Sequence, residues 1–447
     1  MRISRPFAAA AAVLAILGSQ SARADTVEVT STTLLRLGQE TRGGQPGGEP
    51  NLDTVAPAFE ILSISARGVT NPVADDLAIV LSTWGSYDLA DRRWDNGTGS
   101  NLTGEVMTGY VQGKLIDRHL LLRLGRAHVG AGAARMIHLD GGEAVGFLPL
   151  GLRLSAYGGI PVSQRFTTRQ TIRNWNPVGG DLAYGGRLAW SLAIPGVPGR
   201  GVDVGVSANF VEDGGDPVRE EAAADFRIQP LGNLTLSGFG AYSLYDERLS
   251  EVTARATWSL TRKLHLEADG RFVAPDLLLA RNSILSVFSD EERISFGGGV
   301  SYDVGKGLRV GGAYHAQVEP GTTDDDADRL GHDAEARVEW ERGHTLAGGE
   351  VMFLDALQNG YVAVRLFGRR ELGRFFAAAD VFTHFFKEQV NGEDLAVTGT
   401  LTGGVHLARG FSAVISGRAG MTPFLEQTFD VMAKLAYNST YRIREVR

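Results

Sequence analysis

Five ionisable side chains in the first half of the chain could carry chemistry: Arg126, His128, Arg135, His138 and Asp140. Imidazole nitrogens and carboxylate oxygens bind zinc when two or more of them converge on one ion. Neither an HxH nor an HExxH spacing, which is typical of a zinc site, is present. We therefore expect solvated loop or lumen residues here, with a metal site as the less favoured alternative.

The acidic run Asp324–Asp328 offers a second kind of chemistry, because carboxylate oxygens are the ligands that Ca²⁺ prefers. The run lacks the glycine and the distal glutamate of a shaped calcium-binding loop. A solvated acidic loop at the outer end of the protein is the better prediction, and calcium binding is the alternative.

Catalytic chemistry has no recognisable signature in the sequence. There is no GxSxG motif, and no serine stands near a histidine and an acid in the manner of a triad. The chain has no cysteine, which excludes disulfides and thiolate metal sites, and its net charge of −8 argues against a nucleic-acid partner. We expect a protein that is not an enzyme and has no cofactor.

The elements that must position these residues are β-strands. In Lys263–Phe272, Arg293–Asp303 and Asp333–Glu341, apolar and polar side chains alternate residue by residue. Successive side chains of a strand point to opposite faces, so each segment has one apolar and one polar face. A soluble sandwich has the same period, with its apolar face turned into a core. Because the pattern recurs along the whole chain, it favours a closed barrel in lipid, with a polar lumen.

Short and long connections alternate between these segments. Thr261-Arg262 and Gly305–Gly307 are short, whereas Pro161–Gly180, Pro275–Glu292 and Lys387–Glu393 are longer. Outer-membrane barrels join short periplasmic turns to longer outer loops in this way. The sequence predicts an all-β fold: a transmembrane, antiparallel, up-and-down β-barrel of about 18 to 22 strands over residues 25–447.

The first 24 residues have the pattern of a cleaved Sec-type signal peptide. Arg2 and Arg5 form a positive start, Ala8–Leu17 is a short apolar stretch, and Ala22-Arg23-Ala24 is a cleavage site. At the other end, the alternating segment Phe429–Ile443 resembles the C-terminal assembly signal of outer-membrane proteins. We therefore expect an integral outer-membrane protein with outer-membrane lipid and the barrel-assembly machinery among its partners.

The alternation assigns charged side chains of both signs to the lumen. Seven of them are candidates for lining or narrowing it: Arg255, Glu267, Asp269, Arg271, Arg309, Arg337 and Glu339. The positive and negative charges of the inward faces nearly cancel, which suits a neutral or mixed-charge polymer, or solutes passed without selection. We also expect Gly130–Gly142 to be a loop that dips toward the lumen before a short strand, Glu143–Leu148.

A resemblance adds to this interpretation. The segment Leu122–Arg126, followed by Gly130, Gly132 and Ala134-Arg135, resembles the "LRLGRQ…G…R" signature of alginate-export-type barrels and related porins. The resemblance implies a barrel that carries polysaccharide through a charged lumen narrowed by inward-folded loops. It implies that Arg123, Arg126 and Arg135 are lumen or constriction residues. Arg123 and Arg126 stand on opposite faces of a regular strand, so both face the lumen only if a bulge intervenes.

Three functions follow as expectations. The first is an outer-membrane conduit for secretion of an exopolysaccharide, with a periplasmic polysaccharide-export protein and the polymer as partners. The second is a passive-diffusion porin for small solutes. The third is a non-conducting barrel that anchors a surface or motility assembly.

Overall fold

The computed structural model describes residues 26–42, 51–69, 74, 76–90, 102–130, 132–162, 181–193, 201–278, 292–319, 329–355, 359–407, 410–423 and 425–442. The expected signal peptide, the acidic run Asp324–Asp328 and most of Pro161–Gly180 lie outside these residues.

The described residues form β segments that all belong to one antiparallel sheet. The segments of the first half are β1 (Thr26–Arg42), β2 (Asn51–Val55), β3 (Pro57–Val69), β4 (Asp76–Asp88), β5 (Leu102–Leu115), β6 (Leu120–Val129), β7 (Ile137–Phe147), β8 (Leu152–Pro161), β9 (Leu182–Ala193), β10 (Gly201–Asp213) and β11 (Asp216–Leu231). Those of the second half are β12 (Leu234–Ser243), β13 (Arg248–Ser259), β14 (Leu264–Val273), β15 (Arg293–Gly305), β16 (Leu308–Glu319), β17 (Arg329–Arg342), β18 (Thr345–Asp355), β19 (Gly360–Leu372), β20 (Phe375–Val390), β21 (Glu393–His406), β22 (Phe411–Thr422) and β23 (Leu425–Arg442).

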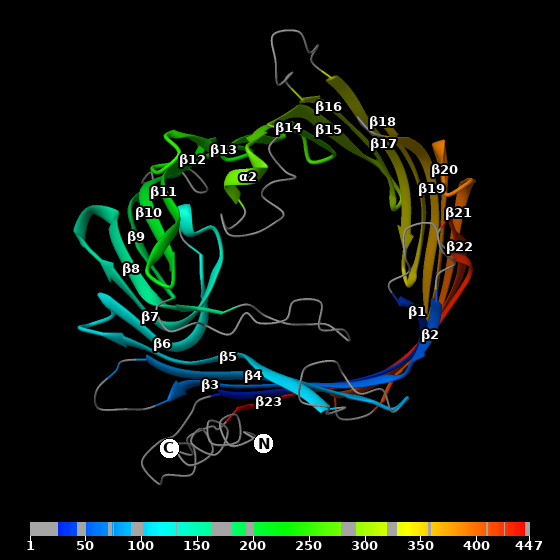
Figure 1. Ribbon diagram of the computed structural model, residues 1–447, viewed down its shortest axis with the longest axis horizontal. Coiled ribbons are helices and arrows are strands. Elements are labelled where there is room, and N and C mark those ends of the chain that lie inside the picture. The colour runs from blue at the N-terminus through cyan, green and yellow to red at the C-terminus, as the bar shows by residue number, and fades with distance from the viewer. Residues whose placement is uncertain are drawn as a thin grey trace.

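Two of these segments are one strand of the wall. Both β2 and β3 pair with β1 in the same register, because Gly38 opposes Val55 and Leu35 opposes Ala58. The wall therefore has 22 strands. The sheet closes on itself where β1 pairs with β23, and Figure 1 shows the resulting ring. The prediction of an all-β, antiparallel, closed barrel is confirmed, and the number of strands is the upper one of the predicted range.

The two faces of the wall differ as the alternation predicts. Leu401 opposes Ala379 and Gly417, and its side chain is 70% exposed on the outside of the barrel. The next residue, Thr402, points to the other face, where its hydroxyl lies 3.0 Å from that of Ser416. Residues directly opposite each other in an antiparallel pair share a face, so each pair extends this division to the neighbouring strands.

The connections differ from the predicted rhythm in two places. Lys387–Glu393 is not a long loop: β20 continues to Val390, and only Asn391-Gly392 separates it from β21. The stretch Gly130–Gly142 is a loop only in part, because β7 already begins at Ile137. The first residues of β7 are paired with β6, as Val129 with Ile137, and the glycine-rich and alanine-rich composition of the stretch gives no strand-like alternation that would predict this pairing.

Short helices complete the described residues. The 3₁₀ helices are η1 (Gly132–Ala134) and η2 (Pro149–Gly151), and the α-helix is α2 (Pro275–Leu278). Figure 1 shows α2 inside the ring, where Asp276 forms an ion pair with Arg248 of β13. Among the residues that the structure describes, no helix has the length and apolar character needed to cross a membrane.

Candidate functional site

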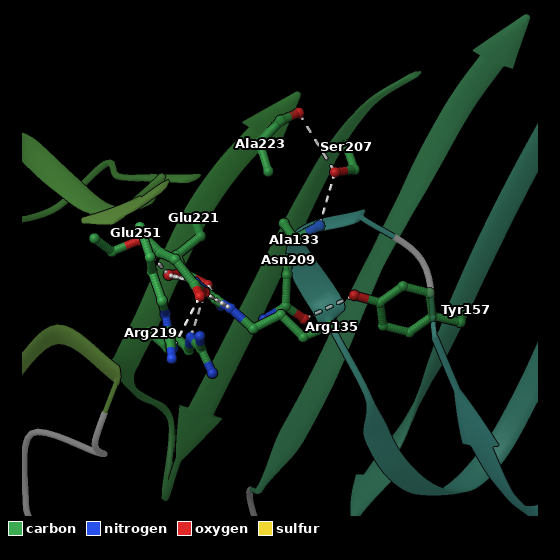
Figure 2. Close-up of polar contacts among 11 residues, drawn as sticks. Ala133, Arg135, Tyr157, Ser207, Asn209, Arg219, Glu221, Ala223 and Glu251 are labelled. Atoms are coloured by element: carbon green, nitrogen blue, oxygen red, sulfur yellow. Dashed lines mark hydrogen bonds and ion pairs between the residues drawn. The ribbon is translucent and has the colours of Figure 1, made fainter. Parts of the chain in front are cut away.

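The connection between β6 and β7 folds across the inside of the barrel. Its helix η1 contacts β10 and β11, although β8 and β9 lie between these strands and β7 in the wall. The backbone N–H of Ala133 donates a 2.8 Å hydrogen bond to the Ser207 hydroxyl of β10. Figure 1 shows this segment inside the ring, and Figure 2 shows its contacts with the wall. We call Gly130 together with Gly132–Met136 the hairpin tip.

The tip reaches the inner face of β10 and β11 because β6 separates from β5 and bends inward. The β5–β6 pairing ends at Gly109 and Arg126, whereas β6 stays paired with β7 as far as Val129. The Arg123 guanidinium donates to the carbonyl of His128 at 3.2 Å. Five extended residues would span about 17 Å, so β6 must curl strongly between these two residues. Gly125, with φ of 124°, provides a backbone conformation there that other residues rarely adopt.

Arg126 stabilises the point where β5 and β6 separate. Its guanidinium donates to the Val106 carbonyl of β5 at 2.8 Å, and it forms ion pairs with Asp140 at 2.6 Å and Glu105 at 3.2 Å. No register shift separates Arg123 from Arg126, so the two lie on opposite faces of the hairpin. Arg123 is on the inner face with Glu143, at 3.0 Å, and Arg126 is not.

Arg135 fastens the hairpin tip to the wall. Its Nη1 lies 2.7 Å from Glu221 Oε2 and its Nε lies 2.9 Å from Glu251 Oε2, and the guanidinium stacks 5.5 Å from the centre of the Phe239 ring. Burial alone would lower the pKa of Arg135, but the hydrogen bonds to Glu221 and Glu251 outweigh burial and raise it. Arg135 has a left-handed φ of 49°, a conformation that persists where contacts of this strength hold it.

The Glu221 carboxylate, which binds Arg135, is buried and accepts several hydrogen bonds. Glu221 is 1% exposed and also accepts hydrogen bonds from Arg219 Nε at 2.8 Å and from the Ser250 hydroxyl at 2.9 Å. Arg271 donates to Glu251 at 3.1 Å. A buried carboxylate is costly unless it is paired and hydrogen-bonded, and here several donors meet this need. Figure 2 shows the Arg135 side chain of the hairpin joined by dashed lines to these carboxylates.

Apolar and neutral polar contacts hold the base of the tip. Val129, Ala134, Leu139, Tyr157 and Ala183 form one buried cluster that joins the hairpin to β8 and β9. The Tyr157 hydroxyl donates a 2.7 Å hydrogen bond to Asn209 Oδ1 of β10, and this amide side chain is 1% exposed. The hairpin tip is therefore packed against the wall as well as charge-paired to it.

Replacing Gly132 by valine is expected to displace the tip without touching its charges. A Cβ at Gly132 would lie 2.0 Å from the Ser207 hydroxyl, and the φ of 52° is strained for a β-branched residue. Single-channel recording should show a higher conductance than wild type. The matched control is Gly214→Val, a turn residue with φ of 63° whose Cβ would meet no atom within 4 Å. Equal currents for both variants would contradict the placement of the tip.

Seven predicted lumen residues lie together on the inner face of β13 to β17. Register places Arg255 opposite Asp269 and Arg309 opposite Glu339, so these side chains share one face. Arg255 forms an ion pair with Glu267, Arg271 with Glu251 and Arg337 with Glu339. Asp269 lies 3.2 Å from His315, whereas Arg309 has no ion-pair partner among the described residues. Five of the seven border a hollow of about 490 Å³: Glu267, Asp269, Arg309, Arg337 and Glu339.

Some residues of the site were not singled out from the sequence. Glu221, Asn209 and Tyr157 receive or support the hairpin tip, and Glu221 could be recognised only as an acid on an inward face. Arg187, 8% exposed, lies between Asp203 at 2.9 Å and Asp225 on the same inner wall. Within the described ranges, no group of three or more histidine or carboxylate side chains is arranged to hold a metal ion.

Comparison with known proteins identifies the fold. A mutant of the ferric enterobactin receptor PfeA of Pseudomonas aeruginosa superposes with a TM-score of 0.57 at 11% identity, over 93% of this chain and 81% of that one. The siderophore receptor PirA of the same organism gives 0.55 at 9% identity, over 92% and 80%. The chain has the fold of an outer-membrane β-barrel. OccAB4 of Acinetobacter baumannii gives a TM-score of 0.46 at 8% identity, over 94% and 99%. No family model and no curated protein matches the sequence.

Proposed function

We propose that this outer-membrane barrel is a channel and that its cargo is an exopolysaccharide leaving the cell. The observation that carries the proposal is the inner wall, which is polar and charge-paired around a ring of 22 strands. Barrels of about 16 to 18 strands already enclose an aqueous channel, so side chains alone do not fill a ring of this size. A hydrated lumen enclosed by 22 strands accommodates a chain of sugar residues.

The charge distribution favours a neutral or mixed-charge cargo. Several inner-wall cations are paired with acids along the wall, as in Arg187 with Asp203, Arg365 with Asp380 and Arg36 with Asp430. Paired charges leave little net potential to concentrate ions of one sign. The direction of transport, and supply by a periplasmic polysaccharide-export protein, rest on the resemblance of Leu122–Arg135 to alginate-export-type barrels.

In this proposal the hairpin tip is the constriction. Arg135 holds the tip against β11 and β13. Nearer the base of the hairpin, the ion pair between Arg123 and Glu143 joins β6 to β7 on the inner face. A hairpin held against the inner wall occupies part of the lumen and reduces the cross-section available to solutes, as pore-lining constrictions do. Arg126, on the other face of the hairpin, serves the bend and not the pore.

A planar-bilayer recording tests the channel itself. We expect open-channel current in KCl and, across a salt gradient, a reversal potential near zero, because the inner charges balance. A strongly cation- or anion-selective current would contradict the balanced lumen. A folded barrel without current would overturn the channel and favour the anchoring role.

The cargo is tested in cells. Deleting the gene should reduce surface and secreted polysaccharide while the polymer accumulates in the periplasm, and the wild-type gene should restore export. The Arg219→Ala variant, which leaves the hairpin contact of Arg135 in place, is the matched control and should export polymer as the wild-type protein does. Unchanged polysaccharide in the deletion strain would refute export and favour a passive-diffusion porin.

A further inference from the structure

Six side chains with aromatic rings line the inner face of two adjacent strands, β19 and β20. Opposing residues of the two strands form pairs, and every second pair points to the inner face. All of these inner-face pairs except Arg369–Ala378 contain an aromatic ring. The rings are Phe376, Phe367, Phe382, His384, Tyr361 and Phe386, in order from the end nearest the chain termini. Successive pairs on one face are about 7 Å apart, so the row extends along most of the wall. We call these six residues the aromatic row.

Neighbouring residues show that the row faces inward. The pairs Phe375-Phe376 and Phe385-Phe386 each place one ring on either side of the wall. Phe375 and Phe385 are 49% and 51% exposed and lie on the outer face, where they oppose Val405 and Leu395. Phe376 and Phe386 are only partly exposed and lie on the other face. The row therefore belongs to the lumen and not to the lipid-facing surface.

Four of the six rings contact one another: Tyr361, Phe382, His384 and Phe386. Phe382 meets His384 edge to face at 4.2 Å, and Tyr361 meets the same imidazole at 5.2 Å. His384 and the Phe386 ring are nearly parallel at 6.0 Å. Lower on the wall, Phe367 lies above Gly348, where an added Cβ would be 2.5 Å from the ring. A ring that rests on glycine lies along the wall and presents its other face to the lumen.

Polar groups border the row on both sides. The guanidinium groups of Arg337 and Arg365 lie 5.4 and 5.2 Å from the centre of the Phe367 ring, and Arg365 is held by Asp380 at 2.7 Å. On the other side, the next two strands contribute hydroxyl groups to the inner face. These are Thr398, Thr400 and Thr402 of β21 and Ser416 of β22.

Wall stability does not require apolar rings at these positions. A water-filled lumen contains no apolar core, and partly exposed phenylalanine faces there forgo part of the stabilisation of full burial. Aromatic faces carry negative partial charge and attract C–H groups and cations. A surface of ring faces bordered by guanidinium, carboxylate and hydroxyl groups matches a pyranose, whose C–H faces are apolar and whose rim carries hydroxyls.

We propose that the aromatic row is a binding track for glycan chains, on which sugar rings stack in turn as the polymer passes. This inference rests on the proposed channel and adds the surface by which the channel recognises its cargo. The adjacent threonine hydroxyls and the Arg365–Asp380 pair bond the sugar hydroxyls at the rim of each stacked ring. Several weak, similar contacts allow a chain to slide, because no single one holds it.

Oligosaccharide block of single-channel current tests the track. Maltohexaose added to wild-type channels in KCl should interrupt the current. In the variant Phe367→Ala/Phe382→Ala/Phe386→Ala, the dissociation constant for this block should rise by at least roughly tenfold, since three ring faces are lost. The matched control Phe375→Ala/Phe385→Ala removes outer-face rings of β20 and should change the constant by less than about twofold.

The outcomes separate the track from the channel. Ionic current without maltohexaose block in the wild type would overturn the track and leave the channel standing. Equal weakening in both variants would also overturn it. No ionic current in a folded wild-type barrel would refute the channel, and the track with it. Because open-channel current in KCl reports folding of each variant, loss of block cannot be mistaken for loss of the barrel.

Discussion

Substitution of Arg135 by alanine is expected to widen the conducting path. Arg135 alone joins the hairpin tip to both Glu221 and Glu251, and charge-assisted hydrogen bonds of this kind contribute about 1.5–3 kcal/mol each. Without them, the tip keeps the Ala133–Ser207 hydrogen bond and its apolar contacts, which hold it less firmly. We expect single-channel conductance to rise by roughly twofold and to become noisier.

The barrel itself should survive this change. Glu221 keeps Arg219 and Ser250 as partners, and Glu251 keeps Arg271, so neither carboxylate is left unpaired. Arg219→Ala is the matched control, because it removes an arginine from the same carboxylate but leaves the hairpin contact in place. Lysine at position 135 should restore wild-type conductance only in part, since an ammonium lacks the planar fork that reaches both acids. A conductance of Arg135→Ala equal to wild type would show that the tip does not limit the pore.

The second large effect is expected when arginine is placed on the lipid-facing side of the wall rather than on its lumen side. Leu401→Arg is expected to lower the free energy of unfolding by about 2–4 kcal/mol, the cost of arginine on the lipid face near the bilayer midplane. Thr402→Arg, one residue further, should change that free energy by less than about 1 kcal/mol because its side chain enters the polar lumen. Leu401 is 70% exposed, and Thr402 bonds Ser416 on the opposite face.

Urea titration of the barrel in phospholipid vesicles, followed by tryptophan fluorescence, measures both values. A greater loss of stability in Thr402→Arg than in Leu401→Arg would invert the assignment of faces. It would then place the predicted lumen charges against lipid. The comparison depends on two adjacent residues, so strand propensity and distance from the membrane surface are nearly the same for both.

Alternation predicted the wall because it is a local property. The spacing of residues along one strand is enough to show which side chains share a face. Arg309, Arg337 and Glu339 could therefore all be assigned to the lumen face before the pairing of their strands was known. The approximate number of strands followed from counting such segments. The end of β20 was missed because Lys387–Val390 is polar and resembles a loop, although its backbone continues the strand.

Other features depend on the tertiary structure. An inward-dipping loop was predicted near Gly130, but its destination was not, because Arg135 meets acids 86 and 116 residues away in the chain. Arg123 and Arg126 are close in sequence, and only the strand register and the curl at Gly125 separate their roles.

The aromatic row has the same origin. Each of its rings stands at an ordinary position of a polar face, and the row exists only where β19 and β20 lie side by side. By itself the sequence determined the chemistry of each face, since side-chain alternation is set by the backbone of a single strand. Only the closed barrel decided which faces meet, because register, curvature and closure depend on contacts between residues far apart in the chain.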